Sequence, residues 1–206
     1  MRLEVSSTRM ELLKLRKRLS LADRGHKLLK RKQDELMRQF LERVEQIGDL
    51  RREIEERLAA AHKGFLMARS VMDGESMEEA IMFPNQRLTL NVSTVPVMNL
   101  RLPQFDVHSQ GNVYSYGLSN TSAELDSALG AYSELLPEML KLSEIERGVE
   151  LLANEIETTR RRVNALEYIL IPNLQDTIKY ITMRLDEMER SNLSRLMKIK
   201  EIIRSH

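Results

Sequence analysis

The stretch ETTRRRVNALEYILIPNLQDTIKYI, residues 157–181, decides the fold. It belongs to a longer row of apolar or small residues that recur in alternating steps of four and three, namely Ile145, Val149, Leu152, Ile156, Thr159, Val163, Leu166 and Leu170. This heptad pattern predicts a helix with a narrow apolar seam. Because a helix with one apolar stripe draws most of its stability from packing, the seam requires a partner helix.

The partner is found in the first third of the chain. Thr8 and Glu11 have the spacing of a capping box, which predicts that a helix begins there. Its apolar row uses the same steps, through Leu12, Leu15, Leu19, Ala22, His26, Leu29, Gln33, Leu36 and Phe40. The row then becomes irregular and predicts a stutter, through Val44, Ile47, Leu50, Ile54, Leu58, Ala61, Phe65, Ala68 and Met72. We therefore predict a helix over residues 8–73.

The middle of the chain changes from helical to strand periodicity. Asp73-Gly74 ends the first helix, a short apolar turn follows, and Pro84 closes that segment. Alternating apolar residues then predict a β-hairpin with a connection at Thr94–Pro96. The apolar positions of this hairpin tip are Leu88, Leu90, Val92, Met98, Leu100 and Leu102.

Prolines are expected to limit the hairpin. Pro96 and Pro103 predict short, edge-like strands, because proline cannot donate a ladder hydrogen bond. A lone hairpin is marginal in water, so its apolar face should rest on the adjoining helices or on another protein. Residues 104–120 are expected to form a loop.

The second long helix begins at another capping-box signal, Thr121 followed by Glu124. Pro137 and Pro172 predict breaks or kinks. Beyond Pro172 the apolar row continues through Leu174, Ile178, Ile181, Leu185, Met188, Leu196, Ile199 and Ile203.

These elements predict a mainly α protein, a long antiparallel two-helix coiled coil with a small β-hairpin tip between the helices. Its parts are an amino-terminal helix over 1–73, a central hairpin with loops over 74–120, and a carboxy-terminal helix over 121–206, forming one structural unit. In the alternative arrangement, each helix pairs with another chain.

Charge is distributed unevenly, although the net charge is only +1. Residues 1–32 hold 11 Lys or Arg and 3 Asp or Glu, a net charge of +8, and residues 161–206 hold 9 and 6, a net charge of +3. Residues 33–80 hold 7 and 12, and residues 121–160 hold 3 and 9, so both are acidic. Antiparallel pairing would join the two basic segments at one end.

Signals for catalysis, metals and cofactors are absent from the sequence. There is no Cys, the four His lie far apart, and no phosphate-binding loop or nucleophile motif occurs. We predict no catalytic, cofactor-binding or metal-binding residues, and not an enzyme. His26 falls on the seam, where a packing role is expected. Without a signal peptide or a long apolar run, a soluble cytoplasmic protein is expected.

Basic runs are the candidate partner-contact residues, namely Arg16, Lys17, Arg18, Lys30, Arg31, Lys32, Arg160, Arg161 and Arg162. One interpretation is a solvated face with ion pairs such as Glu157 with Arg161. Another is a contact with carboxylates of a protein partner, which guanidinium groups bind bidentately. The lack of aromatic stacking platforms and the acidic segments argue against nucleic acid.

Four segments resemble a known family: TRMEL (8–12), GHKLLKRKQDEL (25–36), SNTSAELD (119–126) and TRRRVNALEYILIPNLQDTIKYI (159–181). They are similar to the D subunits of the V-type (archaeal and bacterial A/V-type) rotary ATPases, and the resemblance spans both helices. The central part, 74–118, adds least to it.

The resemblance implies a central-stalk rotor shaft, present once per complex. Its partners would be the A and B subunits of the catalytic hexamer, the small F subunit and the membrane-sector funnel subunit, called C or d. The shaft would couple ATP hydrolysis or synthesis to H⁺ or Na⁺ transport without doing chemistry. It would lie at the cytoplasmic side of the membrane, held there by the complex and not inserted itself. The alternative is a coiled-coil chaperone or scaffold of prefoldin-like architecture.

Overall fold

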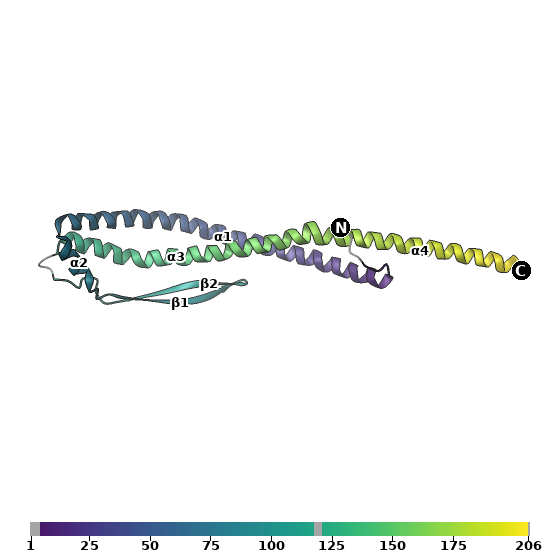
Figure 1. The fold of residues 1–206 in the computed structure, drawn as a ribbon, viewed down its shortest axis with the longest axis horizontal. Helices are drawn as coiled ribbons and strands as arrows, with labels where there is room; N and C mark the ends of the chain where they lie inside the picture. Colours follow the sequence, from purple (N-terminus) through teal and green to yellow (C-terminus); the bar gives the residue numbers. More distant parts are fainter. Residues whose placement is uncertain (1–4, 118–120, 206) are drawn as a thin grey trace. The chain divides into compact units, whose positions relative to one another are not determined.

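The computed structural model describes residues 5–117 and 121–205. Near the carboxy terminus it describes side chains up to residue 204. In chain order the elements are α1 (Arg9–Val71), α2 (Gly74–Met82), β1 (Arg87–Val97), β2 (Leu100–Gln110), α3 (Ala123–Asn164), the π-helical η1 (Ala165–Leu170) and α4 (Ile171–Ser205) (Figure 1). Two long helical stretches flank one two-stranded antiparallel hairpin, which confirms the predicted fold class. The ends of the predicted segments at 1–4, 118–120 and 206 lie outside the described residues.

The chain divides into two compact units. Unit 1 comprises Met1–Leu36 with Ile156–His206, and unit 2 comprises Met37–Glu155. Both units contain a piece of α1 packed against a piece of the second helical stretch.

In unit 1 the two helical pieces run antiparallel and bury the predicted seam. Arg9 pairs with Glu189 and His26 with Glu167, so rising numbers on α1 meet falling numbers on the opposite helix. The core consists of Leu15, Ala22, Leu174 and Ile181, with Leu12, Leu19, Leu170, Ile171, Ile178 and Leu185 packed around it. Burial of this apolar surface holds the two pieces together.

The apolar row of α4 extends further than its partner. Arg9 begins α1 and pairs with Glu189, so α1 reaches no further along α4. Met188, next to this point, is 43% exposed, and the predicted seam residues beyond it are exposed too: Leu196 62%, Ile199 52% and Ile203 71%. The prediction that this part of the row is buried in the seam is therefore wrong for the chain by itself.

In unit 2 the seam keeps steps of four and three, but one member differs from the prediction. Val44 is 40% exposed, whereas Arg43 is half-buried and takes its place. Opposite it on α3 lies the buried Gly148, where a Cβ atom would approach within 3.3 Å of Arg43 Nη1. Because Gly148 has no side chain, there is room for the guanidinium of Arg43. The seam position predicted for Val44 is therefore occupied by Arg43, and the helix has no stutter there.

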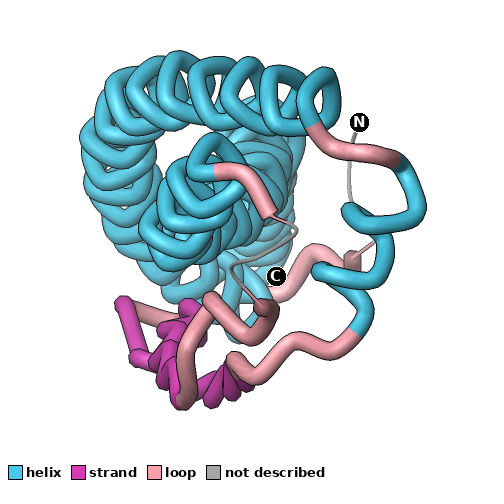
Figure 2. The backbone as a smooth tube through the Cα atoms, turned by 90° about the vertical axis from the view of Figure 1, so that its left-hand side faces the viewer, coloured by secondary structure: helices cyan, strands magenta, loops and turns pink. Residues whose placement is uncertain are grey.

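The hairpin is longer than predicted, and its turn lies elsewhere. The strands pair from Arg87 with Gln110 to Val97 with Leu100, which leaves Met98 and Asn99 as a two-residue turn. The turn predicted at Thr94–Pro96 is wrong, and so is the loop predicted for the first seven residues of 104–120, which lie in β2. Figure 2 shows the two strands in magenta, joined to the helices by loops in pink.

The prolines fit inside the strands because of the hydrogen-bond pattern. Antiparallel partners alternate between hydrogen-bonded pairs and pairs whose N–H and C=O groups point away from the ladder. The Phe105 N–H points away from β1 and donates to Glu144 at 2.8 Å, so Val92 and Phe105 form a pair of the second kind. Pro96 and Pro103 occupy positions of the same kind, where a missing N–H costs no ladder bond. The prediction that they limit the strands is therefore wrong.

The register also divides the apolar hairpin residues between two faces. Leu88, Leu90 and Val92 lie on one face, because directly paired residues share a face and these pair with Ser109, Val107 and Phe105. Leu100 and Leu102 pair with Val97 and Val95 and lie on the opposite face. The expected single apolar face is therefore not formed.

Other boundaries differ in smaller ways. The short apolar turn predicted after Asp73-Gly74 is the helix α2, whose Met77 and Ala80 are buried. The Thr8 hydroxyl caps α1 by accepting the Glu11 N–H at 3.3 Å, as predicted. The second capping box is not formed, since α3 begins at Ala123 and the Thr121 hydroxyl donates to the Gly117 carbonyl.

The two helix prolines have different consequences. Pro137 lies inside α3, which continues through it, so the helix is not broken there, and the predicted alternative, a kink, stays a prediction. At Pro172 the helix is not broken either but changes type: η1 precedes it, and the Ile171 N–H donates to the Leu166 carbonyl five residues back. A kink at Pro172 stays a prediction. The ring of a proline clashes with the carbonyl four residues earlier, and a π turn relieves such a clash.

Candidate functional site

The basic runs all lie in unit 1 and are mostly exposed. Arg16, Lys17, Arg18, Lys30, Arg31, Arg160, Arg161 and Arg162 are exposed, and Lys32 is half-buried. They are carried by the outward sides of α1 and α3, while the inward positions between them, such as Thr159 and Val163, are buried. The helical period therefore separates the apolar seam from the charged surface.

Antiparallel packing brings two of the three runs to one level. His26 Nε2 lies 3.3 Å from Glu167 Oε2. Counting five residues forward from His26 and five back from Glu167 leads to Arg31 and Arg162. We call the six residues at this level the basic collar: Lys30, Arg31, Lys32, Arg160, Arg161 and Arg162. The third run, centred on Lys17, lies about 14 residues or roughly 20 Å further along α1 and does not join the collar.

One collar residue forms the expected local ion pair. Arg161 Nη2 lies 3.3 Å from Glu157 Oε1, and the two side chains are 71% and 65% exposed. A pair this exposed contributes little to stability. Within residues 5–117 and 121–204, no ion pair closer than 4 Å engages Arg160 or Arg162. Their guanidinium groups are presented to solvent, where carboxylates of another protein can reach them.

His26 packs at the seam, as predicted. Its side chain is 18% exposed and faces the more exposed Glu167 at the start of η1. The contact connects α1 with the π turn, which contains no buried residue. Tyr168 and Ile169 of this turn are 71% and 61% exposed.

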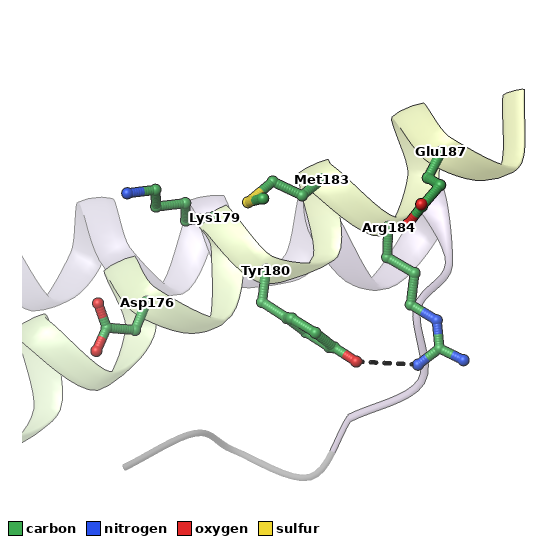
Figure 3. Close-up of a pocket in the computed structure, with 6 residues that line it drawn as sticks. All are labelled: Asp176, Lys179, Tyr180, Met183, Arg184 and Glu187. Carbon is green, nitrogen blue, oxygen red and sulfur yellow. Dashed lines mark hydrogen bonds between the residues drawn. The ribbon is translucent and has the colours of Figure 1, made fainter. Parts of the chain in front are cut away.

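The outward side of α4 carries a shallow hollow of about 660 Å³ (Figure 3). Its described lining is Asp176, Lys179, Tyr180, Met183, Arg184 and Glu187, all from this one helix. The Arg184 guanidinium donates to the Tyr180 hydroxyl at 3.2 Å, the dashed line in Figure 3.

Ion pairs also connect α1 with α3 in unit 2, beside the buried apolar residues, and the sequence alone did not reveal them. Arg57 donates from Nη1 to both carboxylate oxygens of Glu138 at 2.6 Å, and Arg51 pairs with Glu146. The hydrogen bond and charge of Glu138 raise the pKa of Arg57 above its usual value. Heptad spacing gives no signal for such pairs, because their partners are about 80 to 95 residues apart in sequence.

The hairpin docks on α3 through polar contacts. The Phe105 N–H donates to Glu144, and Gln86 donates to the Ser133 hydroxyl at 3.3 Å. Of the predicted tip residues, Leu102 is buried, Leu88 and Leu100 are half-buried, and Leu90, Val92 and Met98 are 40%, 59% and 47% exposed. The contact of Glu144 with a strand amide has no sequence signal, since it depends on how the hairpin folds back.

Neither a membrane span nor a metal cluster is found in the described part of the chain. No described helix has an apolar stretch of the length and hydropathy needed to cross a bilayer. Among residues 5–117 and 121–204, no three His, Asp or Glu side chains come together as metal ligands would.

Known proteins resemble this chain along nearly its whole length. The family model for the ATP synthase D subunit matches residues 11–201. A protein named as the D subunit of a V-type ATP synthase, in Thermoanaerobacter sp. (strain X514), is 52% identical over 203 residues, covering 98% of this chain and 97% of its own. Proteins of the same name in Clostridium botulinum (strain Alaska E43 / Type E3) and Acetivibrio thermocellus are each 52% identical, over 207 and 205 residues, covering 98% of this chain and 97% and 92% of theirs. The chain therefore belongs to the family of ATP synthase D subunits.

Proposed function

We propose that this chain is the central-stalk rotor shaft of a V-type rotary ATPase and conveys torque between the catalytic A/B hexamer and the membrane ion-translocating ring. One observation carries the proposal: in this member of the D-subunit family, the long helical pieces pack antiparallel along a buried seam. Rotation would couple ATP hydrolysis or synthesis to H⁺ or Na⁺ transport. The chain itself would perform no chemistry.

The buried seam supplies the stiffness that torque requires. Residues such as Leu152, Leu174 and Ile181 are fully buried, and interhelical ion pairs such as Arg57 with Glu138 add lateral contacts. Close packing resists sliding of one helix past the other, because any shift would open voids between interlocked side chains. A two-helix shaft is also asymmetric in cross-section, so its rotation presents different faces to the surrounding catalytic subunits.

The partners of this proposal are those of a V-type complex. The A and B subunits would surround the part of the chain that carries both termini, the small F subunit would bind further along, and the funnel subunit, C or d, would connect to the membrane ring. One copy of the chain would serve each complex. It would lie at the cytoplasmic side of the membrane and be held there by the complex, without binding nucleic acid.

The basic collar is the proposed rotor–stator contact. Arg160 and Arg162 have no partner among the described residues, so carboxylates lining the hexamer would engage them. The test is the variant Arg160→Glu/Arg161→Glu/Arg162→Glu in the reconstituted catalytic complex. We expect weaker assembly or slower ATP hydrolysis, whereas the matched Arg→Lys triple variant, which keeps the charge, should lose less. Unchanged assembly and turnover in the reversed variant would sink this assignment.

A second proposed contact is the hairpin. Arg87 and Gln110 are paired, so the hairpin can be removed by joining Gln86 to Gly111 with a short glycine linker. We expect altered assembly, ATPase rate or ion coupling, because a neighbouring subunit would lose its contact with exposed hairpin residues such as Val92. Wild-type values for all three would count against a role of the hairpin.

The prefoldin-like chaperone or scaffold is the rival interpretation. Co-purification with the tagged chain separates the two, since a rotor shaft brings down the nucleotide-binding A and B subunits and a small partner. Recovery of misfolded clients, or of the chain alone, would instead favour the rival.

A further inference from the structure

The outer edge of β1 is the open edge of the hairpin. On the other side, β2 lies nearer to α3 than β1 does (Figure 1). There the carboxylate of Glu144 accepts the outward N–H of Phe105. Among the described residues, β1 has β2 as its only strand neighbour and makes no other backbone–backbone hydrogen bond. One row of strand hydrogen-bonding groups therefore has no backbone partner in the part of the chain that the structure describes.

The register identifies these groups. Because the N–H and C=O groups of Val92 point away from the ladder, those of every second residue along β1 do so too. Two carbonyl groups of β2 agree with this alternation. The carbonyls of His108 and Gln104 point toward β1, where they accept hydrogen bonds from the side chains of Thr89 and Ser93. The outward row consists of Leu88, Leu90, Val92 and Thr94, and it ends at Pro96, which has no N–H.

From Leu88 to Thr94 this edge lacks the usual protection against pairing with other chains. Natural edge strands carry Lys, Pro, inward-pointing charges or bulges, which prevent association. Here no charged residue occurs between Arg87 and Arg101, and the eleven strand pairs run without a bulge. Leu90, Val92 and Val95 are 40%, 59% and 42% exposed. A neutral, regular edge of this kind is suited to accept another strand.

We propose that an extended segment of a neighbouring subunit adds to the hairpin as a third strand along β1. Its side chains would alternate: apolar ones beside Leu88, Leu90 and Val92, and neutral polar ones beside Thr89, Asn91 and Ser93. Pro96 ends the row and thereby fixes how far the added strand reaches. The inference rests on the proposed function in one respect: a chain present once per complex needs a different subunit to supply the strand.

Hydrogen exchange at single-residue resolution tests the added strand. The full chain alone is compared with the same chain in the purified V-type complex. We expect the amides of Leu90, Val92 and Thr94 to exchange at least about tenfold more slowly in the complex. The inward amides of Asn91 and Ser93, protected by β2 in both states, are the internal control. Equal exchange of the outward amides in both samples overturns the proposal.

A proline variant removes one outward donor without breaking the hairpin. Val92→Pro resembles the native prolines at 96 and 103, whereas Val92→Thr keeps the donor and the branched side chain. In the complex, Val92→Pro should abolish the protection of Leu90 and Thr94, while Val92→Thr should retain it and both should keep the inward amides protected. Full protection of Leu90 and Thr94 in Val92→Pro also overturns the proposal.

Other outcomes separate this inference from the proposed function. Protection that rises with concentration of the isolated chain would mean pairing with a second copy, and would overturn the third-strand proposal alone. So would a chain that co-purifies with the A and B subunits and supports ATP hydrolysis but gains no protection. A chain that enters no such complex overturns both.

Discussion

Two isoleucines on α4 belong to the same apolar row but lie in different surroundings. Ile181 is fully buried against α1, whereas Ile199 is 52% exposed beyond the start of α1. We expect Ile181→Ala to lower the free energy of unfolding by about 2–4 kcal/mol, because it removes buried methyl groups and leaves a cavity. The matched change Ile199→Ala should alter it by less than about 0.5 kcal/mol in the isolated chain. Urea unfolding followed by circular dichroism measures both, and similar costs at the two positions would contradict this placement.

A tyrosine of unit 2 makes stability depend on pH. Burial first, and the hydrogen bond to Asp126 at 2.6 Å second, raise the pKa of Tyr116 above its usual range. The folded state therefore favours the neutral phenol. Its contribution to stability is fully present below the unfolded pKa of about 10 and is lost as pH rises through the higher pKa of the folded state.

The expected result concerns the slope of stability against pH. Between about pH 9.5 and 11 the wild type should lose stability more steeply than Tyr116→Phe, which has no proton to lose at this position. Thermal unfolding of the two proteins at matched pH provides the measurement. Parallel slopes would show that the Tyr116 phenol is not held in its neutral form.

At the scale of elements, the π turn η1 acts as a one-residue insertion. The seam around it runs Val163, Leu166, Leu170, Leu174 and Thr177, with two consecutive steps of four where a regular heptad has one. A π turn accommodates an extra residue within a helix, so the seam on both sides can face α1.

Removing that residue should therefore be tolerated at η1 and not elsewhere. Deletion of the exposed Ile169 together with Pro172→Ala should convert the π turn to α-helix and keep both flanking seams inward. Deletion of the exposed Gln175 in α4, as a control, should turn Leu174 away from Ile181 by about 100°. We expect a near-normal midpoint of unfolding for the first variant and a strongly lowered one for the second. Equal losses would contradict the insertion model.

The hairpin illustrates a limit of propensity rules at the same scale. Pro96 and Pro103 appear in the sequence as strand breakers, but both fall at positions whose N–H would point away from the ladder. The actual turn, at Met98-Asn99, has only asparagine as a typical turn residue, and Met98 adopts a positive φ of 54°. Glycine usually fills such a position, so the sequence carried little signal for it.

At the scale of the whole molecule, charge separates along the sequence while the total nearly cancels. We expect the association rate of the chain with the purified A/B catalytic complex to fall on the order of tenfold when NaCl rises from about 50 mM to about 500 mM, because salt screens exposed charges. Replacing Arg160, Arg161 and Arg162 with Gln should flatten this dependence. Arg52→Gln, a change at an exposed residue of unit 2, should leave it nearly intact. Stopped-flow or surface-binding kinetics would measure it, and an unchanged slope for the collar variant would exclude the collar from the contact.

The sequence by itself determined the fold class, the seam from Leu152 to Leu174, the presence of a hairpin and the family resemblance. These follow from patterns within one element or from contiguous motifs, so no knowledge of distant neighbours is needed. Local ion pairing of Arg161 with Glu157 was equally predictable, because four residues span one helical turn.

Only the tertiary structure decided which residues each helix or strand packs against, and how far along the element that packing extends. Leu196 and Ile199 continue the apolar row but lie beyond the point where Arg9 meets Glu189. Arg43 enters the seam because Gly148, about a hundred residues away, leaves space for it. The open edge of β1 likewise depends on Glu144 holding β2 to α3. In each case the deciding atoms are distant in sequence, and periodicity describes which face of an element is apolar but not what covers it.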